Sequence, residues 1–532
     1  MQRQRGLVMG SAAAGALALV VTASPAGAAP NPNSPEKLAD AVTAANVYEH
    51  LEAFQSVADA NGGNRAAGTP GYEASAEYVE AQLRAAGYTP PRQYFDFTYT
   101  EVLSDELYST VDGERADIAH IPMTYSSNTP EGGVTGEIAS PPQGLFGCDA
   151  DDWGDVDPAG KIAVVSRGSC AFGVKADVAG ELGALAIIVY NNTTGALNGT
   201  LGAPIPGSAP AAGVTQEVGL QLLDLPAGAT ITYDFQQLVE TRETFNIFAE
   251  TRTGRDDNVV MVGAHLDGAP EGAGINDNGS GSAAILEAAI QLAKANKVNN
   301  TVRFAWWGAE ELGLLGSWHY VEDLVENNPT ELDNIAIYMN YDMVASPNYI
   351  IGVYDADQST YVAGVQPPEG SIAGETILTD YFDSIGQPWV DTAFSGRSDY
   401  QGFIMNGIPA TGLFTGADGS KTAAEVEMFG GTQGIMYDPN YHTAEDDINN
   451  IEKEALDIMS KAIAYSTGVL AYDTSMINGK TSAGKSGKPH PGKGGTSGKG
   501  NAPGHAGQTG KPAHAGVPGP PPHAASHDKA AA

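Results

Sequence analysis

Apolar residues recur at helical spacing in two stretches of the N-terminal region, residues 36–60 and 73–86. Both stretches predict amphipathic helices, and the second is followed by Gly87, the residue type that commonly ends a helix. From about residue 130 to 235 the pattern changes to short runs of Val and Ile separated by Gly, Pro and Asn. Such runs predict β-strands, here at 162–165, 184–190 and 229–233.

After about residue 245, apolar runs typical of buried strands alternate with stretches of helical spacing. The predicted strands are 259–262, 302–307 and 335–341, and the predicted helices are 282–295 and 312–325. Strands that alternate with helices indicate a mostly parallel sheet. We therefore expect an α/β fold with a mostly parallel central sheet flanked by helices, and a β-rich domain inserted into it.

The first 28 residues have the pattern of a secretory signal peptide. Arg3 and Arg5 precede an apolar stretch at 7–21, and Ala26-Gly27-Ala28 forms an A-x-A cleavage site. The alternative, an N-terminal membrane anchor, needs about 20 apolar residues and no cleavage site. We expect a secreted, extracellular protein whose mature form is soluble and has no membrane segment.

Residues 480–532 differ in composition from the rest of the chain. They are rich in Gly, Pro and Lys, and they contain five of the ten His residues but almost no large apolar residue. Such a segment cannot bury enough surface to offset the entropy of ordering, so we expect a disordered tail. A metal-binding tract and loose attachment to a cell wall are the alternatives.

The overall composition limits the classes of function. Of the 532 residues, 42% are hydrophobic, which is enough to form hydrophobic cores. A chain of this length is too long for a single core, so we expect more than one folded unit. Lys and Arg number 27 against 64 Asp and Glu, giving a net charge of -37. Because such a surface repels phosphate groups and anionic lipids, we expect no nucleic-acid or membrane partner. The high net charge also leads us to expect a monomer.

The two cysteines, Cys148 and Cys170, both lie in the β-rich region. In an exported chain an isolated pair of this kind predicts one disulfide. Two free buried thiols are the alternative. A cysteine-based zinc site is excluded because the chain has too few cysteine ligands.

Residues that can bind metals follow three successive predicted strands. His265 and Asp267 follow the first strand, with Asp277 soon after; Glu310 and Glu311 follow the second, and Asp342 follows the third. In α/β sheets, active sites form beyond the carboxyl ends of the strands. Together with His442, far downstream, this set suits two zinc-type ions that share a carboxylate. His319 is a poorer candidate, because it lies between Trp318 and Tyr320 on a predicted helix.

Several other chemistries have no support in the sequence. The chain has no H-E-x-x-H helix, no G-x-S-x-G turn, and no Walker A or G-x-G-x-x-G motif that opens a helix. A cysteine nucleophile is improbable, since the predicted disulfide uses both cysteines.

The segments that carry these residues resemble peptidase family M28, and among its members the secreted bacterial aminopeptidases with a leucine-type preference. The segments are NGGNRAAGTPGY, GAHLD, GINDNGSGSAA, FAWWGAEELGLLGS, MNYDM, GRSDY, GLFTGA and NYH. The stretch GSCAFGVKADVAGELGALAIIVYNN resembles a protease-associated (PA) domain. The resemblance implies an N-terminal part of the peptidase domain at 36–125, a PA insert at 130–240 and the M28 domain at 245–475.

The resemblance also implies roles for individual residues. His265 and Asp342 would bind one Zn²⁺, Glu311 and His442 a second, and Asp277 both. Glu310 would be the general base for a water between the metals. Asp267 would orient the His265 ring, Tyr441 would stabilise the oxyanion, and Arg397 would order the amino end of the substrate. Met343, Gly396 and Phe414 would line the pocket for the first side chain.

The implied function is a secreted aminopeptidase with two Zn²⁺ per chain that hydrolyses the N-terminal bond of peptides with a free amino end and prefers large apolar residues such as Leu. A PA-containing carboxypeptidase with the same metals and a non-catalytic binding module are the alternatives. One departure concerns the last loop, NYHTAEDD, which lacks the cysteines that close relatives often have there. We expect this loop to be more mobile than in those relatives.

Overall fold

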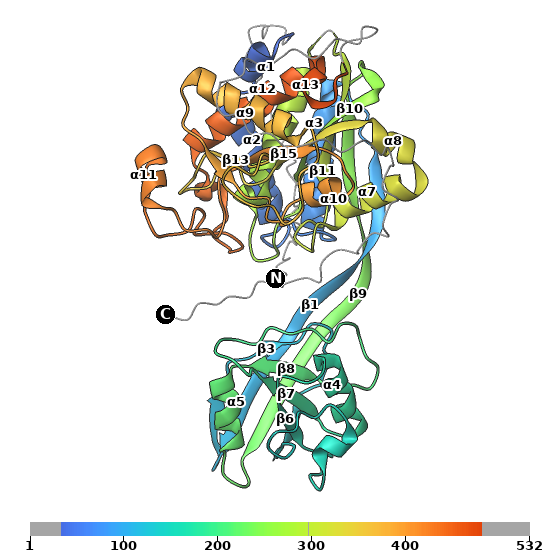
Figure 1. Ribbon diagram of the computed structural model, residues 1–532, viewed down its shortest axis with the longest axis vertical. Helices are drawn as coiled ribbons and strands as arrows, with labels where there is room; N and C mark the ends of the chain where they lie inside the picture. Colours follow the sequence, from blue (N-terminus) through green and yellow to red (C-terminus); the bar gives the residue numbers. More distant parts are fainter. Residues whose placement is uncertain (1–32, 296, 481–532) are drawn as a thin grey trace, which may run out of the picture. The chain divides into compact units, whose positions relative to one another are not determined.

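The computed structural model describes residues 33–295 and 297–480 of the chain. The predicted signal peptide at 1–28 and the tail beyond Lys480 lie outside the described residues. The chain divides into two compact units, one formed by residues up to 95 and from 244 onward, and the other by residues 96–243. We call them the main unit and the inserted unit; strands β1 (Arg92–Val111) and β9 (Thr230–Glu250) each run from one into the other (Figure 1).

The main unit is built on a sheet with the strand order β14-β13-β15-β12-β10-β11-β9. Its four central strands are parallel, whereas β9 is antiparallel to β11, and β13 is antiparallel to β15. The prediction of a mostly parallel α/β sheet with a separate β-rich region is confirmed. The strands are β10 (Arg255–His265), β11 (Asn300–Trp307), β12 (Ile335–Tyr341), β13 (Gly352–Tyr354), β14 (Val390–Thr392) and β15 (Ala410–Phe414).

Helices cover both faces of this sheet, which explains the uninterrupted apolar runs of its strands. In β10, for example, Val260 and Val262 pack into one core while Val259 and Met261 pack into another. The first core contains residues of α1 (Pro35–Ala41), α2 (Ala44–Ala60), α3 (Pro70–Ala86), α6 (Gly281–Leu292), α9 (Ser371–Ile385), α11 (Ala423–Phe429), α12 (Lys453–Tyr472) and α13 (Ser475–Asn478). The second contains residues of α7 (Leu315–Asn327), α8 (Pro329–Asn334) and α10 (Tyr400–Met405).

Three predicted elements differ from the structure for local reasons. The stretch 36–60 forms two helices because the chain is extended at Val42 and Thr43, where the Thr43 hydroxyl caps α2 by accepting from Asn46 N. Helix α7 begins later than predicted, after Leu314 with its positive φ of 62°. Strand β9 continues far beyond residue 233, where the predicted strand ends. The charged residues in this part of β9 interrupt the alternation of apolar and polar positions that would predict a strand.

The inserted unit has its own sheet, with the order β3-β8-β7-β6-β5 and parallel pairing from β5 to β8. Its strands are β3 (Ile121–Pro122), β5 (Ile138–Ala139), β6 (Ile162–Ser166), β7 (Ala186–Tyr190) and β8 (Ala211–Val214), with helices α4 (Phe172–Glu181) and α5 (Gln216–Leu223). Two short strands, β2 (Glu114–Asp117) and β4 (Val134–Gly136), pair with β1 and β9.

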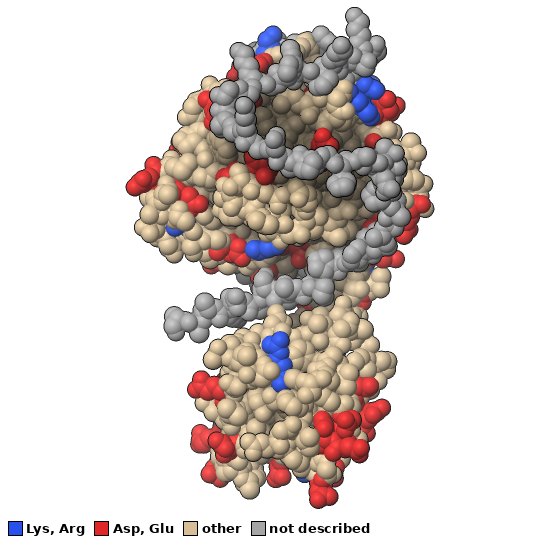
Figure 2. Space-filling view, viewed as in Figure 1, with Lys and Arg blue, Asp and Glu red and all other residues tan. Residues whose placement is uncertain are grey.

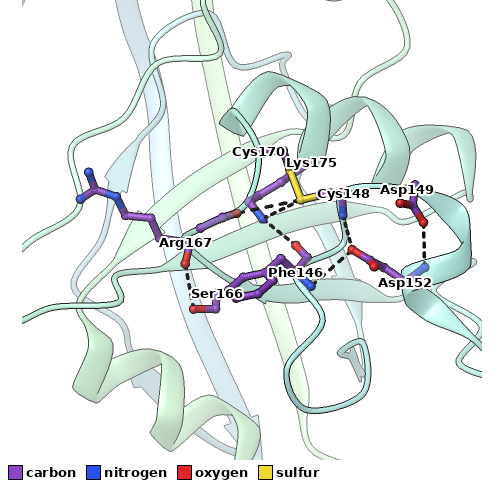
Figure 3. Close-up of a disulfide and its surroundings, with 9 residues drawn as sticks. Phe146, Cys148, Asp149, Asp152, Ser166, Arg167, Cys170 and Lys175 are labelled. Carbon is purple, nitrogen blue, oxygen red and sulfur yellow. Dashed lines mark hydrogen bonds between the residues drawn. A yellow bond between two sulfur atoms is a disulfide. The ribbon is translucent and has the colours of Figure 1, made fainter.

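Cys148 and Cys170 form a disulfide in the inserted unit, as predicted (Figure 3). The bond joins the segment before β6 to the turn before α4. Beside it the Lys175 ammonium donates to Phe146 O at 2.6 Å, and the Asp152 carboxylate accepts from Cys148 N at 2.8 Å. The alternative of two free thiols is therefore wrong.

The surface carries the acidic excess that the composition predicts. Figure 2 shows many more acidic than basic side chains on the visible face of the molecule. Within the described residues, no helix combines the length and the apolarity that crossing a bilayer requires.

Candidate metal centre

The strand order brings three of the predicted ligand segments to one edge of the sheet. Strands β11, β10 and β12 are parallel neighbours, so their carboxyl ends meet at that edge. His265 is the last residue of β10, Asp342 directly follows β12, and Glu310 follows β11 after a two-residue turn. The central position of β10 therefore places His265 between the acids of its two neighbours.

Asp277 joins the predicted ligands into two groups. Its Oδ1 lies 3.3 Å from His265 Nε2, and its Oδ2 lies 3.2 Å from His442 Nε2. Asp342 Oδ1 is 3.2 Å from His265 Nε2, and Glu311 Oε2 is 3.0 Å from His442 Nε2. The structure thus brings all five residues together, in one group of His265, Asp277 and Asp342 and another of Asp277, Glu311 and His442.

Glu310 and Asp267 lie beside these groups. Glu310 Oε2 is 3.8 Å from His265 Nε2, and the residue is 8% exposed. Asp267 does face the His265 ring, but the closer contact is the backbone carbonyl of Asp267, 3.0 Å from Nδ1, while its carboxylate is 3.7 Å away. That carboxylate accepts from the backbone N–H groups of Glu310 and Glu311 at 3.2 and 3.3 Å, so it holds the turn that carries both glutamates.

The electrostatics of the centre call for cations. Burial raises the pKa of Glu310 well above its usual range, and burial together with Asp277 raises the pKa of Glu311 to about 7. Burial opposes a charge on His442, but the neighbouring carboxylates of Asp277 and Glu311 outweigh it and raise the pKa of His442 to about 11. These raised pKa values mean that the clustered side chains bind protons tightly, because no positive charge balances the carboxylates. Divalent ions would supply that positive charge.

The donor set fits zinc, which prefers imidazole nitrogen and carboxylate oxygen. With Nδ1–H donated to the Asp267 carbonyl, His265 presents its Nε2 lone pair to Asp277 and Asp342. Both groups of residues thus combine an imidazole nitrogen with carboxylate oxygens. Glu311 Oε1 is also buried and has no hydrogen-bond partner among the described residues. The residues present therefore fit the metal that the sequence implies.

Tyr441 and Arg397 lie together beside the second group. The Tyr441 ring stacks on that of His442, with centroids 3.8 Å apart. Arg397 Nη2 donates to Tyr441 Oη at 3.2 Å, and Arg397 Nη1 lies 3.1 Å from the carboxylate of Asp418. Burial, with Asp277 and Glu311 nearby, raises the pKa of Tyr441, which keeps its hydroxyl protonated. Tyr441 is therefore a hydrogen-bond donor close to the predicted metals.

Of the three predicted pocket residues, Met343 and Gly396 lie in loops, and Phe414 is the last residue of β15. Met343 follows Asp342, and its carbonyl accepts from Thr415 N at 2.8 Å, which ties it to the end of β15 next to Phe414. Gly396 precedes Arg397 and has a φ of 82°, which favours glycine. Met343 and His442 have positive φ values of 50° and 55°, which non-glycine residues seldom adopt outside functional sites. The pocket itself stays a prediction.

Sequence reasoning missed two residues that hold the predicted ligands. Ser398 Oγ donates to Asp342 Oδ2 at 2.5 Å, and Asp446 accepts from the backbone N–H groups of Asn276 and Asp277 at 2.8 and 3.0 Å. Ser398 lies in the motif GRSDY next to Arg397, which was a predicted site residue. That neighbour could have pointed to Ser398 from the sequence alone. Asp446 lies in an acidic run that reads as solvated surface, and only the fold reveals that it is buried.

Two models of protein families match the chain. The model of "Peptidase family M28" matches residues 246–467, and the model of "PA domain" matches residues 134–222. The first match contains every predicted ligand, and the second contains both cysteines.

The chain is also similar to named aminopeptidases. It is 42% identical to the probable lipoprotein aminopeptidase LpqL of Mycobacterium tuberculosis, over 81% of this chain and 85% of that protein. It is 40% identical to leucine aminopeptidase 2 of Trichophyton tonsurans, over 80% of this chain and 84% of that protein. Its structure resembles that of a zinc aminopeptidase from Bacillus subtilis with a TM-score of 0.54 and 26% identity, over 80% of this chain and 94% of the other.

Proposed function

Because this chain belongs to peptidase family M28, we propose that it is a secreted aminopeptidase with two Zn²⁺ per chain. Its substrates are peptides and proteins with a free amino end, and it prefers large apolar N-terminal residues such as Leu. The observation that carries the proposal is the position of Asp277, whose two oxygens lie 3.3 and 3.2 Å from the imidazoles of His265 and His442.

Asp277 would bind both ions. His265 and Asp342 would complete the site of one ion, and Glu311 and His442 would complete the site of the other. Zinc supplies Lewis acidity at such a centre, which makes water more acidic and polarises a peptide carbonyl. Ser398, Asp446 and the Asp267 carbonyl hold the ligands in place through the hydrogen bonds described above.

Glu310 is the general base. Its carboxylate lies beside the ligands, and its burial raises the pKa, so it binds a proton more tightly than an exposed glutamate does. It takes the proton of the attacking water and passes it to the leaving amine. Asp267 supports this role, because its carboxylate fixes the backbone of the turn that carries Glu310.

Tyr441 donates its hydroxyl to the oxygen of the carbonyl under attack. Arg397 holds the Tyr441 side chain and orders the amino end of the substrate, and Met343, Gly396 and Phe414 line the pocket for the first side chain. A relative named leucine aminopeptidase 2 supports the preference for Leu. The N-terminal signal pattern supports secretion.

The test compares Leu-p-nitroanilide with N-acetyl-Leu-p-nitroanilide, using purified protein before and after treatment with a chelator. We expect hydrolysis of the free amine only, its loss on chelation and its return with added Zn²⁺. Equal hydrolysis of the acetylated substrate would contradict the proposal. Release of C-terminal residues from N-acylated dipeptides would favour the carboxypeptidase instead.

A further inference from the structure

Arg65 is a buried cation of the main unit that forms no salt bridge with any residue that the structure describes. Its side chain is 0% exposed, and it belongs to the segment between α2 and α3. Its guanidinium donates to three backbone carbonyls and forms no ion pair with any described carboxylate. Burying a charge without an ion-pair partner costs folding free energy, so the groups that surround Arg65 must compensate for it.

The three carbonyls belong to the two ends of one loop. Arg65 Nη1 donates to Leu266 O at 2.6 Å, Nε donates to Ala273 O at 2.8 Å, and Nη2 donates to Gly274 O. Leu266 directly follows His265, and Gly274 precedes Asp277 by three residues. The guanidinium therefore ties together the two ends of the loop that separates these two ligands.

Nearby glycines allow the backbone to approach the guanidinium closely. A Cβ added at Gly274 would lie 3.2 Å from Arg65 Nη2, and one added at Gly279 would lie 3.5 Å from it. The ring of Phe54 lies 5.0 Å from the guanidinium carbon. The loop, the glycines and the aromatic ring together enclose the guanidinium of Arg65.

We infer that Arg65 is a positioning residue of the metal centre: it clamps the 266–274 loop so that His265 and Asp277 face each other before metal binds. Its charge faces Asp446, Asp267, Asp277 and Glu311, and so reduces the repulsion among the acids of the centre. A lysine cannot replace it fully, because a compact ammonium group does not span carbonyls at both ends of the loop. The inference rests on the proposed ligand role of His265 and Asp277.

The test measures Zn²⁺ affinity, by competition with a chelating indicator, for Arg65→Met and Arg65→Lys. Residues that support metal ligands change metal affinity by about 10- to 100-fold when they are replaced. We expect the dissociation constant for Zn²⁺ to rise within that range in Arg65→Met and by a smaller factor in Arg65→Lys. If Arg65→Met does not fold, Arg65→Lys decides the matter alone.

Melting temperatures with and without Zn²⁺ separate positioning from general stability. A ligand that binds less tightly stabilises the folded state less, so the rise in Tm on adding Zn²⁺ should be smaller in the Arg65 variants. The control is Arg303→Met, since Arg303 is a mostly buried arginine of β11 that pairs with Glu250 and Glu331 instead. It should lower Tm equally with and without Zn²⁺.

Two outcomes would overturn different claims. Unchanged Zn²⁺ affinity in the Arg65 variants, with equal losses of Tm in both states, would show that Arg65 is only structural. Failure of the wild-type protein to bind Zn²⁺, or wild-type affinity in Asp277→Asn, would instead contradict the proposed metal centre on which the inference rests.

Discussion

Adjacent residues with the same side chain have different proposed roles at this centre. Glu311 Oε2 lies 3.0 Å from His442 Nε2, whereas Glu310 Oε2 lies 3.8 Å from His265 Nε2. The turn after β11 separates them, and the Asp267 carboxylate fixes that turn through both backbone N–H groups. On the proposed assignment, this turn directs Glu311 to a metal and leaves Glu310 for proton transfer.

Replacing each glutamate by glutamine tests this assignment. Glu310→Gln should keep both ions but lower kcat by about 10²–10⁴, the usual contribution of a general base, with little change in KM. Glu311→Gln should lose zinc, because an amide is a poorer ligand, and excess Zn²⁺ should restore part of its activity. Zinc content and kinetics of both variants are the measurements. Loss of zinc in Glu310→Gln alone would reverse the two roles.

Tyr441 and Asp418 allow a graded test of oxyanion stabilisation. Tyr441→Phe should lower kcat by about 10²–10³, the cost of removing one donor to an oxyanion. Asp418→Asn should lower kcat less than about fivefold, because Asp418 acts only through an exposed ion pair with Arg397. In the Tyr441→Phe background, Asp418→Asn should have no further effect. If the effects of Tyr441→Phe and Asp418→Asn on kcat were instead fully additive, Asp418 would not act through Arg397 and Tyr441.

At the scale of elements, the sequence predicted the parts of the centre that lie at strand ends. Apolar runs that end at His265, Trp307 and Tyr341 are readable, and parallel pairing then places the following residues at one edge. The contributions of Arg65 and Asp446 were not readable, because both act on backbone groups of a distant segment. The helix end at Gly87, which has a φ of 94°, was predicted correctly.

Helix α9 supplies a pH-dependent contact that the sequence did not indicate. Glu375 of α9 is 7% exposed, and its Oε2 accepts from the backbone N–H groups of Ala356 and Asp357 at 2.9 and 3.1 Å. Burial raises the pKa of Glu375 from 4.5 to about 7. The folded state therefore binds this proton more tightly than the unfolded state does, and the resulting stability is present below about pH 4.5 and lost as the pH rises through 7.

Glu375→Gln should remove this dependence, because an amide oxygen still accepts both N–H groups but does not titrate. Between pH 4.5 and 7, the free energy of unfolding of the wild type should fall relative to that of the variant. Urea denaturation of both proteins at several pH values, in excess chelator, measures the difference. Parallel curves over this range would show that Glu375 has an ordinary pKa.

At the scale of the whole molecule, the candidate chemistry lies entirely in the main unit. All predicted ligands come from residues 265–442, and the inserted unit contributes none of them. The acidic surface suits a protein whose substrates carry a positively charged amino end.

The C-terminal segment should not contribute to catalysis. All proposed site residues precede it, and Lys480 is the last residue with described contacts, a backbone pairing with Thr474. A chain that ends after Lys480 should therefore keep kcat on Leu-p-nitroanilide within about twofold of the full chain, because the composition of the removed segment, almost without large apolar residues, predicts no core. A large fall in kcat, in a truncated protein with unchanged Tm, would show that the segment acts at the site.

The central claim is a centre of two zinc ions that share Asp277, and its most direct test is a titration of metal-free protein with Zn²⁺. Bound zinc per chain, from elemental analysis, is measured together with the hydrolysis of Leu-p-nitroanilide. We predict that activity rises with bound zinc and reaches its maximum at two ions per chain, and that Asp277→Asn does not reach this stoichiometry. Full activity with one ion or none, or two tightly bound ions in Asp277→Asn, would contradict the account.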